Sequence, residues 1–91
     1  MTWSDVRNHY PDEWLIVEAL AAHTTADGHR ELDDVAVLER CPDGATALAI
    51  YRRLHQLFPA RELYFAHTAR ERLDIRERRW VGIRGGHATV A

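Results

Sequence analysis

The clearest pattern in the chain is the helical spacing of apolar residues between Asp43 and Pro59. Apolar side chains recur there every three or four positions, which gathers them on one side of a helix. They are Ala47, Leu48, Tyr51, Leu54, Leu57 and Phe58. Asp43 is a suitable N-cap, and Pro59 stops the helix. The pattern predicts a helix that buries this side against another element, and the flanking segments read as strands.

Two strands are predicted before this helix. Trp14 to His23 begins with β-forming residues, and its apolar odd positions are expected to face the helix. These positions are Leu15, Val17, Ala19 and Ala21. The polar stretch Thr24 to Arg30 contains Asp27-Gly28, a strong turn signal, so it predicts a hairpin. The return strand, 31–40, separates two apolar sets: Val35 and Val37 on one side, and Leu32, Ala36 and Leu38 on the other.

A third strand, Glu62 to Thr68, is apolar on both faces, as expected of a central strand. A right-handed crossover makes it parallel to the second strand. Insertion beside the first strand then gives the order 2-1-3. Ser4 to Tyr10 predicts a short helix, capped by Thr2 or Ser4, that lies over the sheet edge. The fold class is therefore α+β: a small antiparallel or mixed sheet (ββαβ) with one main helix on one face and a short N-terminal helix.

The last part of the chain has a mixed pattern. A turn is expected over 69–73, because Thr68 and Glu71 fit a capping box, and an extended fourth strand over 79–84. Gly85 and Gly86 end this segment. We expect a single domain over residues 1–86 and a flexible C-terminal tail over 87–91.

Composition and motifs narrow the function classes. The 91 residues are 46% hydrophobic and 29% charged, with a net charge of −2, as in a soluble globular protein. Without a signal peptide or a membrane-spanning apolar run, a cytoplasmic location is expected. Cys41 is the only cysteine, and the six histidines are scattered without metal-ligand spacing. We therefore expect no metal site, no cofactor, no catalytic residues and no enzymatic activity; His67 near Tyr64 is the one notable pair.

Charge is unevenly distributed along the chain. Residues 1–60 hold five Arg and ten acids, whereas residues 61–91 hold seven Arg and four acids. The candidate interaction residues lie in the second part: Arg70, Arg72, Arg76, Arg78, Arg79, Trp80, Arg84, Tyr64 and His67. Acids between these arginines, Glu71, Asp74 and Glu77, make nucleic acid the less favoured partner.

Protein binding requires the fewest assumptions. A small sheet covered by one helix leaves its second face and an edge open, and such edges pair with other chains. Trp3, Trp14 and Trp80 fit either the core or an interface. The sequence therefore predicts a non-enzymatic protein-interaction domain, self-associating as a homodimer. The alternative is a regulatory module that binds nucleic acid or an acidic partner through its Arg-rich C-terminal region.

Four segments carry a family resemblance: MTW, WLIVEALAAH, RELYFAHT and ERRWVGIRG. Together they resemble a family of small, uncharacterised bacterial proteins of cyanobacterial type, over residues 1–85. This resemblance implies a stand-alone domain without naming an activity. The ββαβ order is also similar to small antitoxin-like domains. A minor alternative is a resemblance to a ubiquitin-like β-grasp protein, carried by the order of hairpin, helix and strand and by the closing IRGG. In this chain, however, HATVA follows the diglycine.

Overall fold

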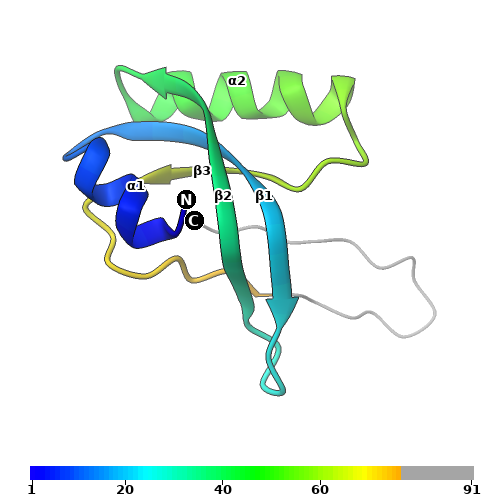
Figure 1. Ribbon diagram of the computed structural model, residues 1–91. Helices are drawn as coiled ribbons and strands as arrows, with labels where there is room; N and C mark the ends of the chain where they lie inside the picture. Colours follow the sequence, from blue (N-terminus) through cyan, green and yellow to red (C-terminus); the bar gives the residue numbers. More distant parts are fainter. Residues whose placement is uncertain (77–91) are drawn as a thin grey trace.

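The computed structural model describes residues 1–76 and shows a three-stranded sheet with two helices (Figure 1). The elements are α1 (Trp3–His9), β1 (Trp14–Thr24), β2 (Arg30–Cys41), α2 (Gly44–Leu57) and β3 (Leu63–His67). The strand order is β2-β1-β3, and β1 is antiparallel to both neighbours. The expected α+β class and the 2-1-3 order are confirmed, but within residues 1–76 β3 lies at an edge of the sheet, where the sequence predicted a central strand. The expected fourth strand and tail lie outside the described residues.

A long hairpin joins β1 to β2 (Figure 1). Its turn is the expected Asp27-Gly28 pair, and Gly28 has a φ of 86°, a left-handed conformation that glycine adopts without a Cβ clash. The amide of Thr25 donates to the carbonyl of His29 at 2.8 Å, which closes the turn. The hairpin prediction is therefore confirmed.

The hairpin register contains three irregularities, between Ile16 and Val17 and on both sides of Ala21. An unmatched residue in one strand moves the following side chains to the opposite face. Leu32 consequently packs in the same core cluster as Val35 and Val37. The prediction that Leu32 faces the other way was wrong, because simple alternation ignores these bulges.

The sheet has a separate core on each face. The face toward α1 holds the larger cluster: Trp3, Val6, Leu15, Val17, Val35, Tyr64, Ala66 and Ile75. The odd positions of β1 therefore face α1, so the prediction that they face the main helix was wrong. Leu15, Ile16 and Val17 are all fully buried, because β1 is covered on both sides. Continuous burial removes the alternation that would distinguish the two faces.

The other face packs against α2, where Ile16, Cys41 and Ala47 are buried and Trp14 is partly buried. Asp43 caps the helix as expected, since its carboxylate accepts from the amide of Thr46 at 2.7 Å. Of the expected apolar stripe, only Ala47 is fully buried, with Tyr51 and Leu54 partly so. Leu57 and Phe58 are 60% and 43% exposed, so their expected burial was wrong. The helix extends past the sheet surface that covers its first turns.

α1 packs on the second face of the sheet, whereas the sequence placed it over an edge. Thr2 begins the helix with a capping box, in which its hydroxyl accepts from the amide of Asp5 at 3.1 Å. The indole of Trp3, only 9% exposed, donates to the carbonyl of Arg70 at 2.9 Å. The expectation that this face lies open was therefore wrong where α1 and the chain after β3 cover it. Trp3 and Trp14 both belong to the core.

Residues 68–76, here called the strap, run from the end of β3 past α1 to the hairpin turn (Figure 1). The expected turn is present only at its start, where the amide of Arg70 donates to the carbonyl of His67 at 3.1 Å. Thr68 does not cap a helix, because its hydroxyl accepts from the amide of Glu13 at 2.9 Å. At the far end the amide of Arg30 donates to the carbonyl of Ile75 at 2.9 Å. The strap therefore fastens β3 to the start of β2 across one face.

Candidate interaction surface at the outer edge of β3

The backbone of β3 alternates between β1 and the outside of the sheet. The carbonyl of Glu62 accepts from the amide of Ala19, and the amide of Thr68 donates to the carbonyl of Glu13, both at 2.9 Å. Even-numbered residues therefore bond to β1, and odd-numbered ones direct their backbone groups outward. Within residues 1–76, the outward amides of Leu63 and Phe65 have no strand beside them. β3 thus presents an open edge within the described chain.

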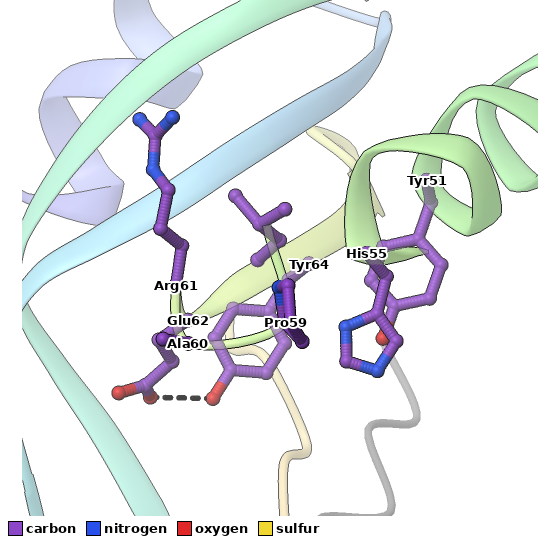
Figure 2. A pocket seen from close by; sticks show the side chains of 8 residues that line it. Tyr51, His55, Pro59, Ala60, Arg61, Glu62 and Tyr64 are labelled. Carbon is purple, nitrogen blue, oxygen red and sulfur yellow. Dashed lines mark hydrogen bonds between the residues drawn. The ribbon is translucent and has the colours of Figure 1, made fainter. Parts of the chain in front are cut away.

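A cleft of about 230 Å³ lies beside this edge, under the C-terminal half of α2 (Figure 2). Its walls come from α2, the 59–62 connection and the start of β3, and it is lined by Tyr51, His55, Pro59, Ala60, Arg61, Glu62, Leu63 and Tyr64. The Tyr51 and His55 rings are stacked, with centroids 5.7 Å apart and planes at 15°. The cleft gives the strand edge a wall of aromatic side chains.

Aromatic contacts continue along the α2 side of β3. The Tyr51 and Phe65 ring centroids are 5.3 Å apart, and those of Phe65 and Trp14 are 6.3 Å apart. Trp14 also makes an edge contact with the His67 ring at 5.2 Å. Such ring pairs add stability beyond their buried area and restrict side-chain motion. The edge of β3 is therefore supported by a fixed row of rings.

Exposed apolar side chains stand at the end of α2, where the chain turns toward β3. Leu57 and Phe58 form the end of the helix, and the guanidinium of Arg61 lies 5.1 Å from the Phe58 ring centroid. Arg61 also donates to Glu18, with its Nε 2.8 Å from Oε2. The hydrogen bond from Arg61 lowers the pKa of the Glu18 carboxyl. Arg61 is therefore held in place while Leu57 remains accessible.

Tyr64, one of the expected interaction residues, is buried in the core and reaches a polar network at the start of β3. Its hydroxyl donates to Oε2 of Glu62 at 2.5 Å (Figure 2). Nε and Nη2 of Arg30 donate to the two oxygens of Glu62, each at 2.9 Å. Burial, and then the Glu62 carboxylate, raise the pKa of the Tyr64 phenol. A neutral phenol in this network joins β3 to β2 and has a structural role.

His67 does not pair with Tyr64, because residues three apart on a strand lie on opposite faces. Its Nδ1 accepts from the amide of Ala69 at 3.0 Å, so the ring proton is on Nε2 when the ring is neutral. Nε2 lies 3.5 Å from Oδ1 of the exposed Asp12. His67 therefore marks the far end of the β3 edge.

The expected basic residues are only partly within the described chain. Arg70, Arg72 and Arg76 are exposed on the strap. Nη2 of Arg72 lies 3.5 Å from Oε1 of Glu31, and Nε of Arg76 lies 3.7 Å from Oδ1 of Asp74. Arg78, Arg79, Trp80 and Arg84 lie outside the described residues. Of the strap arginines, Arg70 is therefore joined to His67 through its amide, whereas Arg72 and Arg76 lie near carboxylates.

Among residues 1–76, no group of His, Cys, Asp and Glu side chains could hold a metal ion. His23 and His67 lie at opposite ends of the sheet, as expected, because β1 pairs His23 with Glu31 and Trp14 with His67. Burial raises the pKa of the Cys41 thiol, so it is a poor nucleophile.

Sequence reasoning missed the exposure of Leu57 and Phe58. Helical spacing placed both in the buried stripe, and the period alone gives no information on where a sheet ends. Their position directly before Pro59, at the end of the helix, is the available signal.

No protein-family model, curated protein or solved structure matches this chain. The resemblance to a small bacterial family therefore stays a prediction. Neither helix in the described part of the chain is long and apolar enough to cross a membrane.

Proposed function

We propose that this protein is a protein-interaction domain that binds a second copy of itself along the outer edge of β3. The observation that supports this most directly is the outward backbone of Leu63 and Phe65, which meets no strand within residues 1–76. Open strand edges with regularly spaced amides and carbonyls pair readily with another strand. Strand addition is therefore the interaction that this edge favours.

A second copy fits the edge because antiparallel pairing of two identical strands has two-fold symmetry. A two-fold axis at Phe65 places this residue opposite Phe65 of the second copy, and Leu63 opposite His67 of the second copy. Outward backbone groups then meet outward groups, as an antiparallel ladder requires. The two three-stranded sheets would join into one continuous sheet.

The side chains around the edge support an interface. Tyr51 and His55 line the cleft beside the strand, Leu57 and Phe58 add exposed apolar surface at the end of α2, and aromatic residues are enriched at interface centres. Of the polar residues that line the cleft, Tyr64 and Glu62 already bond to each other, and Arg30 donates to Glu62. We therefore propose that the domain binds its partner without carrying out a chemical reaction. The proposal includes a cytoplasmic location, because Cys41 is the only cysteine in the sequence and cannot form an internal disulfide.

Amide hydrogen exchange over a dilution series tests the proposed pairing. The amides of Leu63, Phe65 and His67 should become protected as concentration rises, whereas those of Tyr64 and Ala66 should be protected throughout. The inward amides serve as an internal control, because they bond to β1 in any oligomeric state. Full protection of the outward amides in a dilute monomer would contradict the proposal.

A pair of matched substitutions tests the side-chain part of the interface. His55→Glu places a charge in the wall of the cleft beside the β3 edge, whereas Leu20→Glu places one on β1, where Leu20 is 58% exposed. His55→Glu should weaken dimerisation by roughly tenfold or more, and Leu20→Glu should leave it unchanged. Sedimentation equilibrium measures both. Equal effects of the two changes would show that the interface is elsewhere.

Binding of nucleic acid or of an acidic partner is the alternative, supported by the exposed arginines of the strap. Two of them, Arg72 and Arg76, already lie near carboxylates, which reduces the local positive potential. Phosphate binding weakens steeply as salt rises, whereas an apolar strand interface does not. Binding of DNA or RNA with a steep salt dependence, by a chain that stays monomeric, would favour this alternative.

A further inference from the structure

The end of the strap and the hairpin turn meet at the side chain of His29. Nδ1 of His29 lies 3.0 Å from Oδ2 of Asp27, in the turn, and Nε2 lies 3.6 Å from Oδ1 of Asp74, in the strap. The hydroxyl of Thr25 also donates to Asp27. One imidazole therefore bridges two carboxylates from segments that are far apart in the sequence.

The backbone at this point joins the same two segments. His29 and Arg76 form an antiparallel bridge, and the amide of Arg30 donates to the carbonyl of Ile75. Ile75 is buried in the core on the α1 face. The contact of His29 with Asp74 therefore lies beside the last apolar anchor of the strap.

Further charged groups surround the bridge. Glu31 of β2 lies near Arg72, and Nε of Arg76 lies 3.7 Å from Oδ1 of Asp74, the same oxygen that faces the His29 ring. These side chains, apart from Arg76, line an open cleft together with Thr25 and Leu73. The hydroxyl of Thr25, and then His29, hold the pKa of Asp27 at about 2, so this carboxylate is ionised near neutral pH. The ring thus faces acids from both the turn and the strap.

We propose that His29 is a protonation-dependent clasp that fastens the strap to the hairpin turn. Only the imidazolium is positively charged and carries an N–H on both ring nitrogens, so only the charged ring attracts both carboxylates. A neutral ring leaves one carboxylate facing a lone pair. Loss of the proton therefore loosens residues 74–76 and increases local opening around Ile75.

The amide of Arg30 reports this opening, because its hydrogen bond to Ile75 breaks when the strap leaves. Its protection factor, corrected for the intrinsic rate, should fall by about two- to fivefold from about pH 5 to about pH 8, as expected of an exposed ion pair. His29→Gln should remove this pH dependence. Residues 74–76 form the end of the strap farther from β3, at the hairpin turn, so this result is independent of dimerisation.

His23→Gln is the matched control. His23 forms a 2.7 Å pair with Asp33 inside the same hairpin, and no contact with the strap involves this pair. Its substitution should leave the pH dependence at Arg30 as in the unmodified chain. Asp74→Asn provides a second test that keeps the imidazole, and it should reduce the dependence. The proposal would be overturned if the pH dependence of protection at Arg30 were unchanged in His29→Gln or in Asp74→Asn. It would also be overturned if the unmodified chain showed no such pH dependence.

Discussion

Trp3 is the residue through which α1 covers the second face of the sheet, so Trp3→Ala tests the two-sided core. The indole is 9% exposed, and its N–H bonds to the carbonyl of Arg70 in the strap. A helix of seven residues does not form alone in water, so α1 depends on this contact. Loss of the indole should therefore detach α1 and weaken the strap together.

The expected cost follows from the buried area. A Trp side chain buries about 200 Å², which at about 25 cal/mol per Å² amounts to about 5 kcal/mol, an upper value because unfolded chains already bury some surface. Measured Trp-to-Ala changes in cores fall at about 3 to 5 kcal/mol, which we expect for Trp3→Ala. Trp3→Phe keeps most of the apolar area but leaves the Arg70 carbonyl without its donor, at a cost of about 1 to 2 kcal/mol.

Urea denaturation followed by circular dichroism gives the free energy of unfolding for each variant. Ser4→Ala is the control, because Ser4 is exposed in the same helix and Thr2 supplies the cap, so it should change stability by less than about 0.5 kcal/mol. A loss below about 1 kcal/mol for Trp3→Ala would refute the reasoning. It would mean that α1 contributes little to the core.

Two further changes test local features. Asp43→Ala removes the carboxylate that accepts a hydrogen bond from the amide of Thr46. It should lower the free energy of unfolding by about 1 kcal/mol in the same urea assay. No change would mean that the cap does not stabilise α2. Thr25→Ala removes the first cause of the low pKa of Asp27, so an NMR titration should show this pKa moving from about 2 toward 3.8. A carboxyl with a lowered pKa stabilises the fold at pH values above its pKa in the unfolded chain, and this contribution is lost as pH falls through its pKa in the folded protein. The unmodified chain should therefore lose more stability than Thr25→Ala as pH falls from 3.8 to about 2, and equal losses would contradict this.

Local signals in the sequence predicted most of the elements. Asp43 and Pro59 mark the ends of α2, and Asp27-Gly28 marks the hairpin turn, because capping and positive φ are properties of a few neighbouring residues. The 2-1-3 order followed from the handedness of the crossover. These predictions needed no information from distant parts of the chain.

The errors concern contacts between distant segments. Leu15, Ile16 and Val17 are all buried, so parity could not identify which face of β1 meets which helix. A bulge places Leu32 on the face opposite to the predicted one, and Leu57, predicted to be buried, is exposed at the end of α2. Each error arises because a periodic pattern identifies an apolar face but not the layer that covers it.

The sequence predicted the kind of function, protein binding, but it did not predict which part of the surface forms the candidate site. Basic and aromatic composition directed attention to the strap and to Tyr64, whereas Tyr64 is buried in a network with Glu62. An open strand edge depends on which strands pair, and a sequence shows pairing only indirectly. The outer edge of β3 therefore emerged only with the topology.

The coverage of the sheet determines where a partner can bind. α1 and the strap occupy one face, and α2 occupies the other, so an added chain cannot pack on either core cluster without displacing them. The outer edge of β2 already receives two segments, since Val35 donates to the carbonyl of Met1 and Arg30 to that of Ile75. Within residues 1–76, no other segment bonds to the outward backbone groups of Leu63 and Phe65, and Leu63 lines the cleft under α2. Blunting one edge while leaving the other open is the arrangement expected when pairing is restricted to a single edge.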